Sequence, residues 1–334
     1  MTARHSFVPV TLFTLLRVVL SPSAVSAQQI WALEDQPHYR PFKGEPRAAQ
    51  INITALALSD EFPFQQKPGR RRIWDISLGK EIPVFGLYTE AKAQTLGEGA
   101  GWWGIFVPIG FHMVEDFKDD SAPIINTDYR FAVSLKYLRG LGNGWGMGFK
   151  VEPVGHESTH LGDEFTLAAS KNDPDFFRIN VSYEYWDVAW YAQKETDRGT
   201  WRFQAGVIGL WGDNGFYTFD FSETGGREVT PSNRSLEPYF DVERLSRTGW
   251  LGGWNWFLSL DVRSRIVFDY FRADPDIKED RQLTSNLMIG LRDIGRDVGI
   301  IDFFVRLYHG VNRNGQFRSE RGYFLLGIGF HVGV

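Results

Sequence analysis

Residues 322–334, at the C-terminus, alternate between large apolar side chains and small or polar ones. The apolar set is Phe324, Leu326, Ile328, Phe330, Val332 and Val334. Because successive side chains of a strand point to opposite faces, one face of this segment is apolar to its last residue. A strand with a continuous apolar face is typical of a wall that contacts lipid.

The same period of two recurs along the chain, for example over residues 129–137, 254–266 and 301–307. In residues 254–266 the face opposite the apolar one carries Asp261, Arg263 and Arg265. A soluble β-sandwich also alternates, but it keeps charged positions toward solvent and its aromatic side chains in one core. Charged side chains opposite a broad apolar face are ordinary in the polar interior of a membrane barrel, which this pattern therefore favours.

Read back from the C-terminus, the alternation predicts an all-β fold with a single antiparallel transmembrane β-barrel of about twelve strands. The predicted strands lie near 48–58, 73–90, 101–112, 127–139, 144–156, 177–194, 200–211, 234–245, 253–266, 282–293, 299–309 and 320–333. Long and short connections alternate between them, as in bacterial outer-membrane barrels with long loops outside. The alternation slips near 185–187 and 85–89, where a bulge or a hairpin would fit, so the range is ten to fourteen strands.

Residues 1–27 have the features of a secretory signal peptide. Arg4 and His5 precede an apolar run from Phe7 to Leu20, and small residues before Ala27 form a cleavage site. No other segment is long and apolar enough to be a transmembrane helix. Export without a membrane-spanning helix predicts an integral protein of the bacterial outer membrane.

The predicted domains are the signal peptide, an extended segment over 28–47, and the barrel over 48–334. Residues 28–47 contain Pro37, Pro41 and Pro46 and show no clear strand pattern, so we expect them in the periplasm or in the barrel lumen. The lumen is predicted to hold charges of both signs, whose long paired side chains would leave no wide channel. These residues are Arg130, Lys136, Lys150, Glu152, Arg202, Asp261, Arg263, Arg265, Asp302 and Arg306.

Charge and cysteine content exclude several classes of function. Removing residues 1–27, which hold two arginines and no acidic residue, changes the formal net charge from -5 to -7 (-5 - 2), which argues against nucleic acid as a partner. The chain has no cysteine, so disulfides, thiol catalysis and zinc-thiolate sites are excluded. The expected partner is membrane lipid. The sequence does not indicate an oligomeric state.

Residues 155–165, Gly-His-Glu-Ser-Thr-His-Leu-Gly-Asp-Glu-Phe, are the segment richest in chemically active side chains. His156 and Ser158 are two residues apart, so on a strand they project from one face, which suits an imidazole acting as general base for a serine hydroxyl. A third polar group would have to orient the other ring nitrogen, and Asp163, Glu164 and Asn180 are candidates.

The residues Thr127-Asp128-Tyr129-Arg130-Phe131-Ala132 followed by Gly155-His156-Glu157-Ser158 resemble a strand pair of outer membrane phospholipase A. That resemblance implies a twelve-stranded barrel with a His-x-Ser pair and a following Asn that hydrolyse lipid at the outer leaflet with calcium. Carried over, the catalytic residues are His156, Ser158 and Asn180. The sequence departs from the family pattern where Thr159 and His160, rather than Asn-Gly, follow Ser158, and where Asn180 is displaced from the expected position.

Over most of its length, the chain is more similar to an uncharacterised outer-membrane barrel family catalogued only as a domain of unknown function. The residues that carry this likeness are 45–50, 156–165, 178–180 and 315–317. That resemblance implies a barrel and supplies no activity. In addition, strict alternation from Trp145 places His156 and Ser158 with Lys150 and Glu152 on the lumen side, unless a bulge at Pro153 to Gly155 resets the phase.

Three interpretations of this segment stay open. His160, Asp163 and Glu164 could form a hydrogen-bonded loop anchor, His156 and Ser158 could serve a serine hydrolase, or the cluster could bind a ligand or metal. The zinc alternative uses His156, His160, Asp163 and Glu164, and the calcium alternative uses Asp163, Glu164, Asp173 and Asp175.

Two functions follow from these alternatives. The first is an integral outer-membrane barrel without catalysis, serving an envelope-structural, binding or narrow-transport role. The second is an outer-membrane lipid hydrolase, of phospholipase or lipid A deacylase type, that uses the His-x-Ser pair. In either case Arg70, Arg71 and Arg72, in a predicted external loop, could bind the phosphates of lipopolysaccharide or could be a solvated charge run.

Overall fold

The computed structural model describes most of the predicted barrel and part of the segment before it. The described ranges are 29–31, 40–46, 48–59, 71–88, 98–117, 123–163, 166–167, 171, 178–211, 216–219, 228–229, 236–247, 254–267, 280–292, 300–313 and 322–333. Residues 1–27 lie outside these ranges, so the signal peptide and its cleavage after Ala27 stay predictions. No helix in the described ranges is long and apolar enough to cross a membrane.

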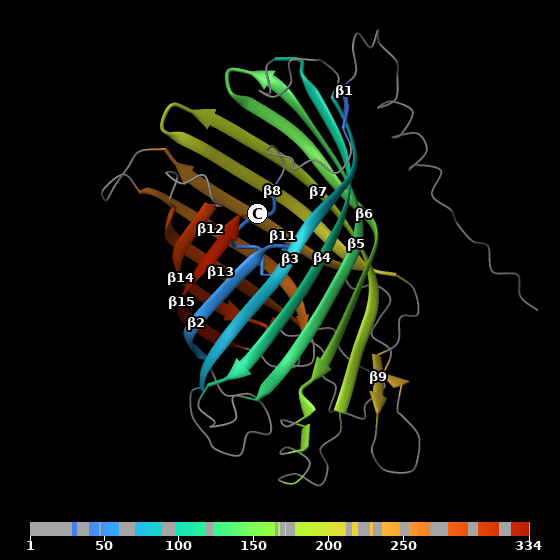
Figure 1. The fold of residues 1–334 in the computed structure, drawn as a ribbon. Helices are drawn as coiled ribbons and strands as arrows, with labels where there is room; N and C mark the ends of the chain where they lie inside the picture. Colours follow the sequence, from blue (N-terminus) through green and yellow to red (C-terminus); the bar gives the residue numbers. More distant parts are fainter. Residues whose placement is uncertain are drawn as a thin grey trace, which may run out of the picture.

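Twelve strands form one closed antiparallel barrel (Figure 1), which confirms the predicted fold class. They are β2 Ile51–Ser59, β3 Arg71–Tyr88, β4 Gly101–Asp116, β5 Ile124–Gly142, β6 Trp145–Leu161, β7 Arg178–Thr196, β8 Gly199–Leu210, β11 Leu236–Ser246, β12 Asn255–Val267, β13 Asp280–Arg292, β14 Ile300–Gly310 and β15 Tyr323–Gly333. Each pairs with its neighbour in this order, and β15 pairs with β2 to close the ring. Closure leaves this wall without an edge strand.

Three further short strands pair beside this ring. β1, Gln29–Trp31, pairs with the end of β3. β9, Phe216–Phe219, and β10, Glu228–Val229, pair with each other, and β9 also pairs with residues 178–180 of β7. The sequence placed residues 212–233 in one long connection, so this hairpin was missed.

Neither of the two places where the alternation slips is a hairpin. β7 runs unbroken through residues 185–187, and the register shift lies in its partner β6, between Glu152 and Gly155. β3 is also one strand, with a shift between Pro83 and Phe85. A bulge adds one residue to a strand without reversing its direction, so the number of barrel strands stays at twelve.

The outer and inner faces of the wall carry the side chains that the alternation predicts. Phe131, Phe303 and Ile328 remain about half exposed on the outer face, at 49%, 52% and 52%. All ten charged residues predicted for the lumen are buried. Several form close ion pairs, such as Lys150 Nζ with Asp187 Oδ2 at 2.7 Å. An apolar exterior with an ionic interior is the arrangement of a membrane barrel, and this chain has an outer-membrane β-barrel fold.

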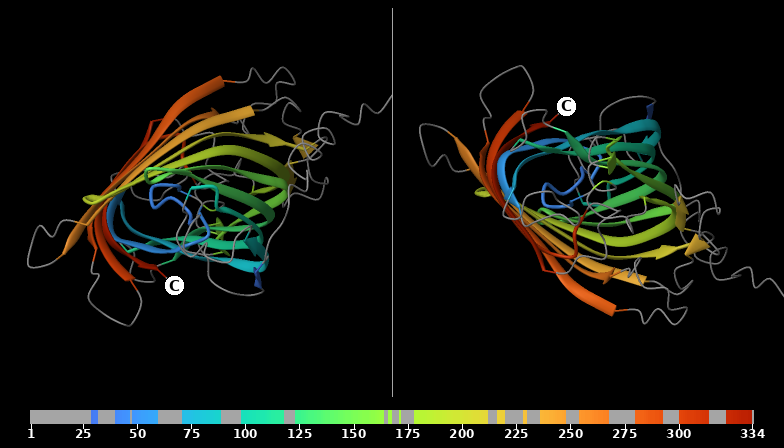
Figure 2. Two further views of the ribbon diagram at one scale, coloured as in Figure 1. Left: turned by 90° about the horizontal axis from the view of Figure 1, so that it is seen from above. Right: turned by 90° about the horizontal axis from the view of Figure 1, so that it is seen from below.

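Part of the segment before β2 lies inside the barrel. Figure 2, which views the barrel along two opposite directions, shows this blue segment within the ring of strands. The Gly44 N–H donates to Ser259 Oγ of β12 at 2.8 Å, and Asn286 Nδ2 of β13 donates to the Gly44 carbonyl at 2.5 Å. Backbone groups that find partners on the wall satisfy the requirement that buried amides be paired.

Charged side chains fix the same segment to opposite parts of the wall. The Lys43 ammonium pairs with Asp302 of β14. The backbone N–H of Lys43 donates to Glu243 Oε2 of β11 at 2.9 Å. Glu45 Oε1 lies 3.6 Å from Arg130 Nη1 of β5. Residues 40–46 and 48–50 are called the lumen segment below. Its contacts with β5, β11, β12, β13 and β14 attach it to the inner face of the barrel.

Candidate active site on the outer barrel face

His156 and Ser158 lie on the outer face of β6. Pro153 and Val154 are consecutive exposed residues, after which Gly155 and Glu157 are buried. The extra residue of the bulge therefore exchanges the two faces for the rest of the strand. The strict alternation that places His156 and Ser158 in the lumen is wrong, because it omits this bulge. β6 also continues to Leu161, five residues beyond its predicted end at 156.

The local sequence explains why the bulge is here. Pro153 has no backbone N–H to contribute to a sheet ladder. Trp211, just after β8, donates its indole N–H to the Pro153 carbonyl at 2.7 Å. On the lumen side, a Cβ added to Gly155 would lie 2.1 Å from the Tyr185 ring, so only glycine leaves room for that ring. The bulge is thus held from both faces of the wall.

The imidazole of His156 has a carboxylate beside it on the next strand. His156 and Glu184 are Cα partners in the β6–β7 register, and His156 Nδ1 lies 3.4 Å from Glu184 Oε1. Both side chains are partly exposed, at 43% and 45%. The sequence did not identify Glu184 as a candidate. The feature that could have identified Glu184 is the bulge, because only the shifted register brings position 184 opposite position 156.

Ser158 lies between two histidines on the same outer face. Its Oγ is 3.3 Å from His160 Nε2, two residues further along β6. The His160 ring also meets Tyr129 of β5 edge to face, with ring centroids 5.8 Å apart. His156 is two residues away on the other side. Alternate residues of a strand share a face, so a serine hydroxyl has one imidazole on each side.

Apolar side chains border this polar row on the β5 side. Phe131 is the Cα partner of His156, and Tyr129 is the partner of Ser158; their exposed fractions are 49% and 47%. Residue 161, where β6 ends, adjoins one of the long connections, which lie at the extracellular end in barrels of this class. The row thus lies on the outer face near the end that we assign as extracellular, next to side chains suited to acyl chains.

Of the other predicted candidate residues, only Asp163 has a side chain that the structure describes. Asp163 is exposed and helical, two residues after the end of β6. Glu164, Asp173 and Asp175 lie outside the described residues. Asn180 belongs to β7 and its Cα pairs with Tyr217 of β9, but its side chain is also outside them.

No group of three or more His, Asp or Glu residues that could hold a metal ion occurs in the described part of the chain. His156, His160 and Asp163 are described and form no such group, so each metal alternative depends on residues outside the described ranges, Glu164 for zinc and Glu164, Asp173 and Asp175 for calcium. Of the arginine run, Arg72 is exposed at the start of β3, Arg70 lies outside the described residues, and the side chain of Arg71 is not described. Binding of lipopolysaccharide phosphates by this run stays a prediction.

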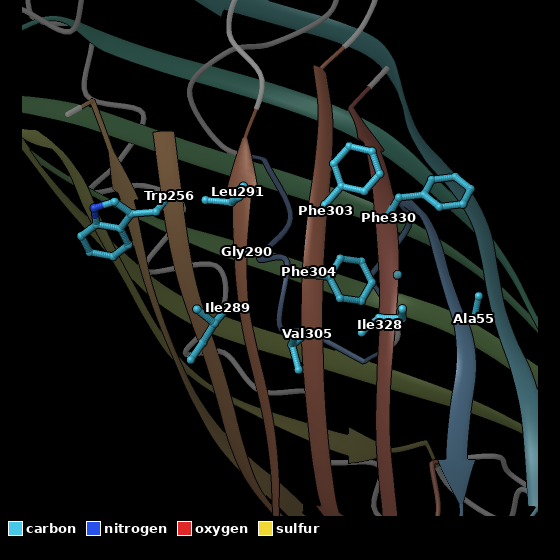
Figure 3. A pocket seen from close by; sticks show the side chains of 11 residues that line it. Ala55, Trp256, Ile289, Gly290, Leu291, Phe303, Phe304, Val305, Ile328 and Phe330 are labelled. Carbon is cyan, nitrogen blue, oxygen red and sulfur yellow. The ribbon is translucent and has the colours of Figure 1, made fainter. Parts of the chain in front are cut away.

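An apolar depression of about 780 Å³ lies on the other side of the barrel, between β12 and β2 (Figure 3). Its lining includes Trp256, Phe303 and Ile328, and consists of hydrophobic residues and glycine. In the strand order, β14 is separated from β6 by five strands in either direction. This depression is therefore remote from the polar row and provides no catalytic side chain.

No family model matches the chain, and no curated protein matches it. Among solved structures, the chain is similar to outer membrane phospholipase A from Escherichia coli, at 10% identity and a TM-score of 0.47, over 90% of this chain and 94% of that one. The translocator domain of the autotransporter NalP from Neisseria meningitidis matches at 10% identity and a TM-score of 0.40, over 89% and 90%. The β domain of the Bordetella autotransporter BrkA matches at 10% identity and a TM-score of 0.37, over 86% and 100%. Matches this distant carry no information on activity.

Proposed function

We propose that this protein is an outer-membrane hydrolase of lipid acyl esters, with Ser158 as nucleophile, His156 as general base and Glu184 as the group that orients the base. The observation that carries the proposal is the contact between His156 Nδ1 and Glu184 Oε1 at 3.4 Å, on the face that also presents Ser158. Nucleophile, base and orienting acid are the three roles that acyl transfer to a serine requires.

The ring geometry assigns a role to each nitrogen of His156. A carboxylate beside Nδ1 favours the tautomer with the proton on Nδ1, which leaves Nε2 as the acceptor for a serine proton. In the first step Ser158 Oγ would attack the ester carbonyl carbon while its proton passes to His156. The protonated imidazole would then give that proton to the departing alkoxide, and water would release the fatty acid from the acyl-enzyme by the reverse proton transfers.

In the structure Ser158 bonds His160, so its hydroxyl must rotate to reach His156. Catalytic hydrogen bonds often tighten only when substrate binds, and a rotation about the Cα–Cβ bond of serine is rapid. His156 is the better base because Glu184 stands beside its second nitrogen, whereas the described contacts of His160 are with Ser158 and the Tyr129 ring.

The surroundings support a membrane lipid as the substrate. The lumen segment occupies the interior, and His156 and Ser158 face away from it. Phe131 and Tyr129 offer an apolar surface to an acyl chain, while the polar row faces the ester at the extracellular end. Glycerophospholipids and lipid A both present acyl esters at that level, so the class of substrate is the acyl ester of an outer-leaflet lipid.

A structural role without catalysis is the second candidate, and the Ser158–His160 hydrogen bond favours it. That bond would tie the last residues of β6 before the long connection and would act as a loop anchor. The lumen segment, with its charged contacts, suits a rigid barrel in either case. The two candidates differ in what they expect from Ser158, since an anchor needs no reactive hydroxyl.

The test is release of fatty acid by the purified protein in detergent micelles, from a phospholipid and separately from lipid A, with and without calcium. We expect Ser158→Ala and His156→Ala each to lower kcat by at least about a thousandfold, as for other nucleophile and base removals. The matched control is Ser182→Ala, because Ser182 is the Cα partner of Ser158 on β7. Equal release by wild type, Ser158→Ala and His156→Ala would leave the structural role.

A further inference from the structure

A buried Arg–Tyr–Glu cluster lies on the lumen side of the wall, directly behind the candidate site. Arg130 Nε donates to the Tyr185 hydroxyl at 2.6 Å, and Arg130 Nη2 donates to Glu152 Oε2 at 3.0 Å. Tyr185 OH also lies 3.5 Å from Glu152 Oε2. The three residues come from β5, β7 and β6, so the cluster joins the strands on both sides of β6.

The cluster surrounds the bulge that sets which face His156 and Ser158 occupy. Glu152 is the last residue before the shift and Gly155 is the first after it. The Tyr185 ring packs directly on Gly155, which pairs with Tyr185 in the register. Arg130 holds the hydroxyl of that ring, and Arg130 is the Cα partner of Glu157, the residue between His156 and Ser158.

We infer that Arg130 and Tyr185 are positioning residues for the site on the opposite face of the wall. Their hydrogen bond holds the Tyr185 ring in contact with Gly155 and stabilises the β6–β7 register at the bulge. That register sets the face that His156 and Ser158 occupy, and it places Glu184 opposite His156. The catalytic consequence rests on the proposed function, whereas the structural consequence does not.

The lumen segment takes part in the same cluster. Glu45 Oε1 lies 3.6 Å from Arg130 Nη1, so Arg130 bridges the lumen segment and the wall behind the site. Arg130 thus has an ion pair with Glu45 in addition to its hydrogen bonds to Tyr185 and Glu152, and hydrogen bonds from charged groups are among the stronger ones inside proteins. Chain that precedes the barrel in sequence thereby supports the geometry of the outer face.

A second cluster of the same composition provides a matched control. Arg202 Nε donates to the Tyr191 hydroxyl at 3.2 Å, and Arg202 Nη1 lies 2.6 Å from Glu243 Oε1. Tyr191 is on β7 like Tyr185, is fully buried in the lumen, and lies away from the bulge. Tyr191→Phe removes the same hydroxyl from the same strand without touching the candidate site.

The first measurement is hydrogen exchange of the backbone amides of residues 155–161 in folded protein in micelles. Loss of one buried hydrogen bond of about 1 kcal/mol corresponds to about fivefold faster exchange by local opening. We expect this acceleration in Tyr185→Phe, and also in Arg130→Lys, which keeps the charge and loses the planar fork. Tyr191→Phe is expected to leave residues 155–161 unchanged and to accelerate exchange only around its own position.

The second measurement is lipid ester hydrolysis, with the concentration of active protein titrated by a serine-directed fluorophosphonate. Tyr185→Phe is expected to lower kcat about tenfold with KM unchanged, because it alters the alignment of reacting groups without contacting substrate. Tyr191→Phe is expected to retain wild-type kcat. A general loss of folded protein would lower the titrated concentration and leave kcat per active molecule as it was.

The two measurements separate failure of this inference from failure of the proposed function. Unchanged exchange of residues 155–161 in both Tyr185→Phe and Arg130→Lys overturns the positioning role, whatever the activity. Faster exchange together with a wild type that hydrolyses no lipid ester supports the positioning of β6 and refutes the hydrolase. An equal loss of kcat in Tyr191→Phe would also overturn the inference, because the effect would not be specific to the bulge.

Discussion

His156 Nδ1 and Glu184 Oε1 lie 3.4 Å apart on the outer face of the barrel, as direct neighbours across the β6–β7 ladder. A carboxylate beside this nitrogen favours the tautomer with the proton on Nδ1. The pair exists because the bulge in β6 shifts the register by one residue. In the proposed function, Glu184 takes the orienting role that the sequence resemblance gives to Asn180.

The first prediction distinguishes these two orienting residues. Glu184→Gln keeps the size of the side chain and removes its charge, so we expect kcat for lipid ester hydrolysis to fall by at least about a hundredfold. Asn180→Ala is expected to retain activity within about threefold, the scatter ordinary for changes outside a catalytic unit. Steady-state hydrolysis by both variants checks this, and the reverse order of effects would restore Asn180 as the orienting group.

The second prediction concerns which imidazole is the base. His160→Ala removes the hydrogen bond that now occupies the Ser158 hydroxyl, and it leaves His156 and Glu184 in place. We expect this variant to keep kcat within about threefold of wild type, whereas His156→Ala loses at least about a thousandfold. Measured kcat values for the two single variants decide the matter. A larger loss in His160→Ala would make His160 the base and His156 a structural neighbour.

Strands and faces could be predicted from sequence because each depends on local alternation. Arg130 and Phe131 are adjacent, and one is buried in the lumen while the other is exposed outside, as a period of two requires. The same logic recovered all twelve strands of the ring, within a few residues at most of their ends. β7 is one strand, as the alternation of long and short connections requires, and the register shift opposite Tyr185 belongs to its partner β6.

The candidate site could be predicted only in part, because it depends on a single bulge. His156 and Ser158 were identified from their spacing, but their face depends on whether the chain adds one residue between Glu152 and Gly155. That addition is stabilised by groups distant in sequence, namely the Tyr185 ring and the Trp211 indole. No local pattern reports such contacts, so the outward direction of His156 and its pairing with Glu184 could not be derived.

The third prediction tests the packing at the bulge. Gly155→Ala places a methyl group within 2.1 Å of the Tyr185 ring, so the ring or the strand must move, at a cost of about 1–3 kcal/mol. We expect the folded barrel to unfold at a lower temperature, which is measured from its altered mobility on SDS gels. We also expect a lower kcat. Gly110→Ala on β4 is the matched control, because its nearest neighbour, His112 Nε2, lies at an ordinary 3.4 Å. Equal stability of the two variants would show that Tyr185 does not pack tightly on Gly155.

The fourth prediction concerns the interior. The lumen segment bonds to β12 and β13 through the Gly44 backbone, and to β14 and β5 through Lys43 and Glu45. We expect the wild type to show little conductance in planar bilayers, and a variant lacking residues 40–50 to conduct, because water would replace the segment among the wall charges. Unitary conductance of both proteins checks this. Similar conductance of the two proteins would mean that the wall side chains, and not the lumen segment, determine whether ions pass through the barrel.

The fifth prediction is a dependence of this closure on acid. Burial raises the pKa of the Glu45 carboxyl, but the charges of Lys150, Arg130 and Arg263 outweigh burial and hold that pKa below its ordinary value of 4.5. A lowered carboxyl pKa stabilises the seated segment above about pH 4.5, and this contribution is lost as pH falls through the folded pKa. We therefore expect wild-type conductance to stay constant between pH 7 and 5 and to rise below that range.

Glu45→Gln lacks this titration, so its conductance should already be higher at pH 7 and should change less on acidification. The wall carboxylates also titrate in acid, and an identical pH profile for wild type and Glu45→Gln would assign the whole response to them.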